Sequence, residues 1–196
     1  MRAAVRALDG LLRRLFGIRE FSRSADCLLR LSVVRSRRDL TLADGTVVRP
    51  GDRVGDLHLW NERMPPLPRE WPDLRWALGF QRRLKRSLEE LADAVASDPA
   101  YADLAAFRAV GSAMTRHGAL PALAERLGFE LVEDPHAGGL WRRFASFWEN
   151  VYSLALVWVY NPASLRSKEL RGLRRVQLWI SRGELERRYG RCGAAR

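Results

Sequence analysis

Cysteine and lysine are scarce in this chain of 196 residues, and the scarcity of cysteine argues against several kinds of site. The two cysteines, Cys27 and Cys192, lie far apart and form no Cys-x-x-Cys pair. That spacing does not fit a zinc ribbon, a dithiol redox centre or a disulfide-stabilised scaffold. We therefore expect a reducing compartment and no function based on cysteine chemistry.

The motifs that hold common cofactors are also missing. There is no phosphate-binding P-loop, no dinucleotide fingerprint and no Gly-x-Ser-x-Gly nucleophile elbow. A metal site would need three or four ligands. The residues that could supply them have no spacing that brings them together: His58, Glu62, His117 and His136. We expect no cofactor and no metal.

Long apolar runs are absent as well. The longest continuous one, Leu154 to Tyr160, is much shorter than the roughly 20 residues that span a bilayer. The basic segment from Met1 to Phe16 has neither the apolar centre nor the cleavage site of a secretory signal. The sequence thus predicts no transmembrane segment and a cytoplasmic location, with a peripheral position at the membrane left open.

Arginine is abundant. The formal net charge is +11, and only Lys85 and Lys168 are lysines. Such a bias is typical of a GC-rich genome and informs mainly on solubility and non-specific binding. It also favours, as one alternative, weak contact with nucleic acid or an anionic membrane. Since 47% of the residues are hydrophobic and 29% are charged, the chain is expected to fold around a hydrophobic core.

Alternating and helical spacings of apolar residues divide the chain into elements of both kinds. Strands are predicted at 27–35, 40–42, 46–48, 53–59, 107–114, 129–132 and 176–180. Helices are predicted at 2–16, 74–97, 120–127, 140–160 and 183–189. This order favours an α+β fold whose sheet is mixed or mainly antiparallel, with two long helices at about 74–97 and 140–160. We expect a single domain over residues 1–190 and a flexible tail over 191–196.

Two local signals mark the ends of elements. Asp44-Gly45 supplies the positive φ that a tight hairpin turn needs between the two short early strands. Ser181, with Glu184 three residues later, has the spacing of a capping box. It therefore predicts the start of the last helix.

Three stretches stand out for the order of their residues. The first runs from Leu42 to Leu59, contains the Asp44-Gly45 turn, and is followed by Asn61. The second runs from Leu123 to Glu130. The third is Trp179-Ile180-Ser181-Arg182, with Glu184-Leu185 and Arg188-Tyr189-Gly190. In these stretches the chain resembles the YkoP-like domain, an uncharacterised bacterial domain family, over about residues 3–190.

The resemblance implies a role but no established activity. The family is found alone and, in some proteins, fused to polysaccharide deacetylases, which implies a link to envelope polysaccharide metabolism. We expect no deacetylase domain within these 196 residues, since no Asp–His metal triad is visible in them. What the resemblance implies is an accessory protein that works beside envelope-polysaccharide enzymes.

Polar residues that could bind a ligand are concentrated in and just after the predicted strand 53–59. Asp56 and His58 share a face of that strand, so the carboxylate could orient the imidazole as a base. The segment predicts a small polar pocket for a sugar or an anionic ligand. Arg53 would supply charge and Trp60 a stacking face. The expected ligand-binding residues are Arg53, His58, Trp60, Asn61 and Glu62.

Other interpretations remain open. His58 could form an acid–base pair with Asp56 or Glu62, which would make the protein an enzyme. Asp56 and His58 could instead form only a structural hydrogen-bonded pair on a half-exposed sheet face. The basic surface could bind a membrane or nucleic acid, and high salt would abolish that binding.

The predicted helix 140–160 is unusually aromatic. The residues that share one of its faces are Trp141, Phe144, Trp148, Val151, Ala155 and Trp158. Such a face is typical of a core element but also suits a docking surface. A cluster of basic residues follows it: Arg166, Lys168, Arg171, Arg174 and Arg175. Pattern alone does not separate these roles.

Overall fold

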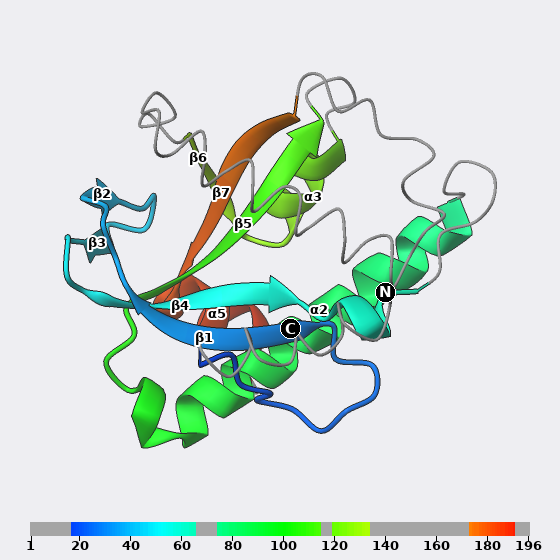
Figure 1. Ribbon diagram of the computed structural model, residues 1–196, viewed down its shortest axis with the longest axis horizontal. Coiled ribbons are helices and arrows are strands. Elements are labelled where there is room, and N and C mark those ends of the chain that lie inside the picture. The colour runs from blue at the N-terminus through cyan, green and yellow to red at the C-terminus, as the bar shows by residue number, and fades with distance from the viewer. Residues whose placement is uncertain (1–16, 66–73, 115–118, 134–172, 191–196) are drawn as a thin grey trace, which may run out of the picture.

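The architecture is α+β. The computed structural model describes residues 17–65, 74–114, 119–133 and 173–190. Within these residues the chain forms a five-stranded mixed sheet, a two-stranded antiparallel sheet and three α-helices, which confirms the predicted fold class (Figure 1). Three predicted segments lie outside the described residues: the helices 2–16 and 140–160 and the tail 191–196.

The large sheet has the strand order β1-β4-β5-β7-β6. Its strands are β1 (Leu29–Arg35), β4 (Arg53–Leu59), β5 (Ala106–Met114), β6 (Glu130–Glu133) and β7 (Leu173–Ser181). The pairing of β4 with β5 is parallel, and the other three pairings are antiparallel. A parallel pair needs a long crossover. The 24-residue helix α2 (Leu74–Ser97) lies within that connection, between the short 3-10 helices η1 (Asn61–Arg63) and η2 (Pro99–Tyr101).

Most predicted elements lie within one or two residues of their expected bounds. The hairpin strands are β2 (Leu40–Thr41) and β3 (Val47–Val48), and Gly45 between them has φ 85°. The remaining helices are α3 (Ala119–Arg126) and α5 (Arg182–Tyr189). β7 is longer than predicted because its first residues pair with the end of β5, Leu173 with Met114. The two arginines after Leu173 interrupt the apolar pattern there and conceal the strand in the sequence.

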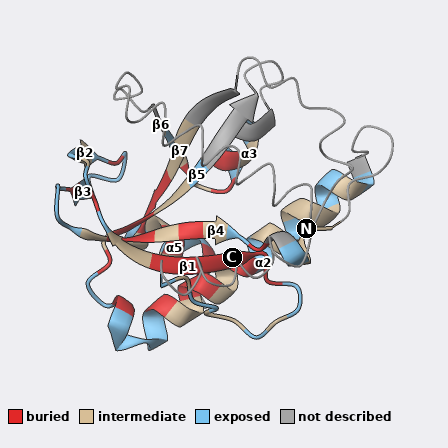
Figure 2. Ribbon diagram, in the orientation of Figure 1, coloured by how far each residue is buried: buried red, intermediate tan, exposed pale blue. Residues whose placement is uncertain are grey.

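One face of the large sheet is covered by helices. In β1, β4 and β5, Leu31, Leu57 and Phe107 belong to the same buried cluster as residues of α2 and α5. The members that those helices contribute are Leu88, Leu91, Ala92, Val95, Leu185 and Tyr189. Figure 2 shows this burial along the middle of the sheet and along one half of α2. Since successive strand residues alternate, the neighbouring residues point to the opposite face.

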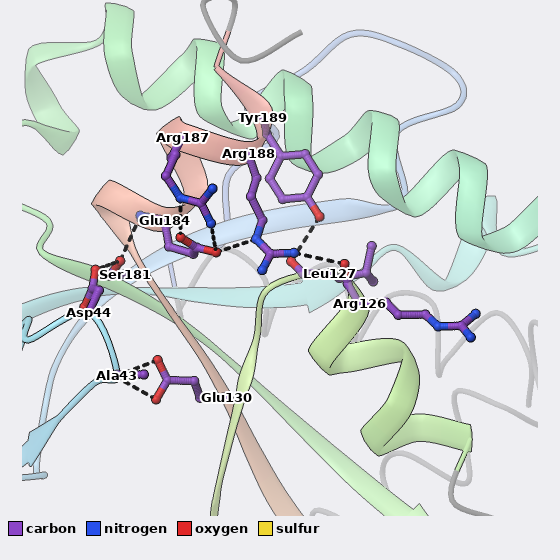
Figure 3. Close-up of polar contacts among 10 residues, drawn as sticks. All are labelled: Ala43, Asp44, Arg126, Leu127, Glu130, Ser181, Glu184, Arg187, Arg188 and Tyr189. Carbon is purple, nitrogen blue, oxygen red and sulfur yellow. Dashed lines mark hydrogen bonds and ion pairs between the residues drawn. The ribbon is translucent and has the colours of Figure 1, made fainter. Parts of the chain in front are cut away.

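One end of that opposite face is covered by the β2–β3 hairpin. Leu42 and Val48 pack there in a second buried cluster with Val54, Ala106 and the fully buried Trp179. The hairpin is also fastened through polar contacts (Figure 3). The Glu130 carboxylate of β6 accepts from the backbone N–H of Ala43 at 2.9 and 3.0 Å.

The N-terminus of α5 completes this attachment. The Ser181 hydroxyl donates to the Asp44 carboxylate of the hairpin turn, which lowers the pKa of that carboxyl. The same hydroxyl oxygen accepts from the Glu184 N–H at 2.9 Å, so the predicted N-cap is confirmed. The Glu184 side chain accepts hydrogen bonds from Arg187 and Arg188 of its own helix.

The three stretches that carry the family resemblance therefore meet in space. The hairpin turn contacts β6 and α5, and α5 contacts the end of α3 (Figure 3). Tyr189 donates its hydroxyl to the Leu127 carbonyl at 3.0 Å, and Arg188 donates to the Arg126 carbonyl at 3.2 Å. These bonds hold the fold together, so the shared residue order reflects the architecture at this corner of the molecule.

Candidate functional site

Polar side chains from three adjacent strands share the sheet face opposite the one on which α2 and α5 pack. Register places Arg30 opposite His58, and Ser32 opposite Asp56. In the parallel pair, Asp56 lies opposite Arg108 of β5. We call these five residues the polar strip: Arg30, Ser32, Asp56, His58 and Arg108. It runs from the edge strand β1 across β4 to β5, the middle strand of the sheet.

The strip is linked by short contacts. Ser32 Oγ lies 3.0 Å from His58 Nε2, within hydrogen-bond distance. Arg108 donates two bonds to Asp56, from Nε to Oδ1 at 3.2 Å and from Nη2 to Oδ2 at 3.1 Å. Asp56 and His58 share a face, as predicted, but Asp56 Oδ2 is 3.9 Å from His58 Nε2. The expected hydrogen bond between these two residues is therefore replaced by separate bonds to Arg108 and Ser32.

Exposure differs among the residues of the strip and is highest at His58. Arg30 and Ser32 are buried, at 6% and 3% exposed. The side chains of Asp56 and Arg108 are 14% and 21% exposed, and that of His58 is 36% exposed. Removing charged groups from water is unfavourable unless they are paired. A ligand that approaches from solvent would therefore contact the imidazole first, because the other side chains of the strip are less exposed.

The electrostatic surroundings keep His58 neutral. Burial lowers the pKa of the imidazole, and the nearby guanidinium groups of Arg108 and Arg30 lower it further. The Asp56 carboxylate acts in the opposite direction and offsets only part of this effect. A neutral imidazole can accept a hydrogen bond at one nitrogen and donate one at the other. His58 thus adds one hydrogen-bond donor and one acceptor to the strip.

The lowered pKa of His58 predicts a pH-dependent stability. In the unfolded chain the imidazole takes up a proton near its ordinary pKa of 6.5, whereas the folded protein resists protonation to lower pH. The stabilisation is present above 6.5 and is lost as pH falls through the lowered folded pKa. We expect the free energy of unfolding to decrease from neutral pH to about pH 5, and less so in His58→Gln. Urea unfolding at several pH values measures both slopes, and equal slopes would contradict the assignment.

Trp60 and Glu62 lie beside the strip and contact Arg30. The Trp60 side chain is buried, and the guanidinium carbons of Arg30 and Arg63 lie over its ring at 4.0 and 3.2 Å from the ring centre. Such cation–π contacts stabilise the guanidinium groups. Arg30 also lies 3.4 Å from the Glu62 carboxylate. The ring that the sequence suggested as a stacking face is thus occupied by two arginines of the protein itself.

The structure does not bring Arg53 to His58. The two residues have opposite parity in β4, and Arg53 Nη1 donates to the Asp103 carboxylate at 2.6 and 2.7 Å. Arg53 therefore joins β4 to the segment after η2. Asn61 is the first residue of η1, and Trp60 separates it from the end of β4.

The sequence alone did not reveal the hydrogen-bonding partners of Asp56 and His58. Ser32 and Arg30 alternate with apolar residues in the predicted strand 27–35, but nothing in the pattern indicates which strand lies beside it. Arg108 lies in the predicted strand 107–114, where the sequence suggests no role for it. A charged residue inside a largely apolar strand was the one available signal, because burying it requires a partner.

No group of three or more potential metal ligands forms within the described residues. None of the helices in the described part of the chain has the length and apolar character needed to span a bilayer. A family model, the YkoP domain, matches residues 1–189. No curated protein and no solved structure matches the chain.

Proposed function

This chain belongs to the YkoP domain family, and on that premise we propose that it is an accessory protein of cell-envelope polysaccharide synthesis or modification. Its ligand would be a sugar, bound through hydroxyl groups at the exposed end of the polar strip. The observation that carries the proposal is the linked set Ser32–His58–Asp56–Arg108, in which the His58 side chain is the most exposed.

A contribution to folding stability does not explain why the sheet contains this group of linked polar side chains. A buried ion pair is often no more stable than apolar residues of similar volume. The Asp56–Arg108 pair lies between central strands, where leucine or valine would pack well. A polar group retained at such a position is more readily explained by recognition of a ligand than by folding.

The chemistry of the strip favours a neutral ligand over an anion. Arg108 is neutralised by Asp56, and Arg30 lies 3.4 Å from Glu62 and 3.6 Å from Glu20. His58 is neutral at physiological pH because its pKa is lowered. Without excess positive charge, the strip offers alternating donors and acceptors, which suit the hydroxyl groups of a sugar.

Binding is better supported than acid–base catalysis. The Asp56 carboxylate already accepts two hydrogen bonds from Arg108, so both of its oxygens are engaged away from the imidazole. In a catalytic triad the carboxylate and the hydroxyl contact different nitrogens of the imidazole. Here Ser32 and Asp56 both approach Nε2, at 3.0 and 3.9 Å. The acid–base interpretation therefore stays the second candidate.

A thermal-shift screen of the full chain tests the proposal. The panel contains chitin and peptidoglycan oligosaccharides as neutral or weakly charged sugars, and nucleotide sugars, acyl-CoA and short DNA as anions. A ligand at about 100 times its dissociation constant adds roughly 2.7 kcal/mol of stability, which is readily measured. We expect a shift with a neutral oligosaccharide that is lost in His58→Ala and Ser32→Ala.

Arg49→Ala is the matched control, because Arg49 is exposed and lies outside the strip, after β3. This variant should keep the shift. If His58→Ala keeps it as well, or if anions alone produce it, the proposed site is wrong.

A further inference from the structure

An exposed valine shares the sheet face of the polar strip. Val110 of β5 lies two positions after Arg108, so strand alternation places both side chains on one face. Val110 is 41% exposed, whereas Ala106, on the same face at the start of the strand, is fully buried. Gln177 of β7 lies opposite Val110 in the antiparallel ladder. The polar strip is therefore followed on this face by an apolar surface and an amide.

Val110 lies one step along the sheet from the exposed end of the strip. The ladder between β4 and β5 ends at Leu57 and Ala109, although β4 continues to Leu59 and β5 to Met114. His58 and Val110 are the next residues of the two strands. In Figure 1 the strands diverge from this point toward their ends. A ligand that contacts the imidazole can thus reach the valine as well.

The Gln177 amide presents donors at this place. Trp179 donates from Nε1 to Gln177 Oε1 at 3.2 Å. An indole nitrogen can only donate, so this bond fixes the amide with its oxygen toward Trp179. The NH₂ group keeps two N–H donors, and no other described residue forms a hydrogen bond with this side chain. Gln177 is only partly buried, so a ligand can accept from these donors.

We propose that the sugar recognised by the polar strip carries an N-acetyl group, which Val110 and Gln177 bind. The inference rests on the proposed function, because it extends the same site. The acetamido methyl would pack on Val110, and its carbonyl oxygen would accept from the Gln177 NH₂ group. Its N–H would donate to His58 at the ring nitrogen that Ser32 does not contact.

A sugar with hydroxyl groups alone fits this neighbourhood less well. Removing apolar surface from water is favourable only when apolar atoms cover it. A hydroxyl group beside Val110 would leave that gain unused. The acetamido group supplies a methyl and a carbonyl acceptor together, and it is uncharged. A neutral substituent also agrees with a strip in which Asp56 neutralises Arg108.

Isothermal titration calorimetry of the full chain with two trisaccharides tests this inference. Chitotriose and cellotriose share the same linkage and ring stereochemistry, and they differ only in an acetamido or hydroxyl group at C2 of each ring. We expect chitotriose to bind about tenfold more tightly, as one added hydrogen bond and one apolar contact would give.

Two conservative substitutions locate the preference. Gln177→Glu keeps an oxygen for the Trp179 indole but removes the NH₂ donors, and Val110→Thr keeps the branched shape but replaces a methyl with a hydroxyl. Each should weaken chitotriose binding by about fivefold. Neither should change cellotriose binding, and that titration also shows that the variant is folded.

Val47→Thr and Gln81→Glu are the matched controls. Val47 is 42% exposed in β3, and Gln81 is partly buried in α2. Both variants should bind chitotriose as the wild type does, and equal weakening in them would overturn the inference. So would a preference for chitotriose that survives both Gln177→Glu and Val110→Thr. Equal affinity for the two trisaccharides that is lost in His58→Ala would overturn the inference and leave the proposed function intact, whereas no binding of either would contradict both.

Discussion

Replacing Asp56 by alanine should lower the free energy of unfolding by about 3 kcal/mol, because removing one partner of a largely buried ion pair leaves an uncompensated charge. Arg108 is 21% exposed and donates two hydrogen bonds to the Asp56 carboxylate. Without that carboxylate, the guanidinium group stays between central strands with no anion to receive its donors. Urea unfolding followed by circular dichroism measures the loss.

A double variant separates stability from recognition. In Asp56→Leu/Arg108→Leu both charges are removed and the two strands gain an apolar pair, which should restore stability to within about 1 kcal/mol of wild type. The same variant should show no thermal shift with the oligosaccharide that stabilises the wild type. A double variant as unstable as Asp56→Ala would mean that the ion pair is needed for folding. A double variant that still binds the oligosaccharide would show that the polar strip does not bind the sugar.

Gly55→Ala should be equally damaging, with a loss of about 3 kcal/mol in the free energy of unfolding, because the core has no room for an added methyl group. Gly55 lies in β4, between β1 and β5, on the face that packs against the helices. A Cβ there would overlap Phe107 Cδ1 and lie 2.8 Å from Phe107 Cε1 and 2.9 Å from Leu31 Cδ1. Phe107 is fully buried, so its ring cannot move aside without disturbing the core.

Gly79→Ala is the matched control for that substitution. Gly79 lies within α2, and a Cβ built on it meets no atom within 4 Å. Alanine is favoured over glycine inside a helix, so this variant should gain about 0.5–1 kcal/mol. Chemical denaturation of both variants gives the comparison. A Gly55→Ala protein as stable as the wild type would show that β4 and β5 can separate to admit the methyl group.

Local pattern in the sequence was sufficient for most elements. The alternation of Leu29, Leu31 and Val33 predicted β1, and the Asp44-Gly45 turn predicted the hairpin. Ser181 predicted the start of α5 because an N-cap acts within a single turn of helix. Each of these signals involves residues only a few positions apart, because the interactions that form a strand, a turn or a helix cap are local in the sequence.

The pattern was insufficient where a residue's partner lies on a distant element. Asp56 was placed near His58 because both lie on one strand, yet its hydrogen-bonding partner is Arg108, more than 50 residues away along the chain. The sequence also did not predict the burial of Trp60, because its ring is covered by Arg30 of β1 and Arg63 of η1.

What the sequence by itself determined is most of the strands and helices, the turn and the cap, and the shared face of Asp56 and His58 in β4. The tertiary structure alone decided that Ser32 and Arg108 flank them, that Arg53 faces away, and that Gln177 lies opposite Val110. The physical reason is that strand order and register arise from packing across the whole core. Hydrophobic burial is non-directional, so no local spacing encodes which polar groups it brings together.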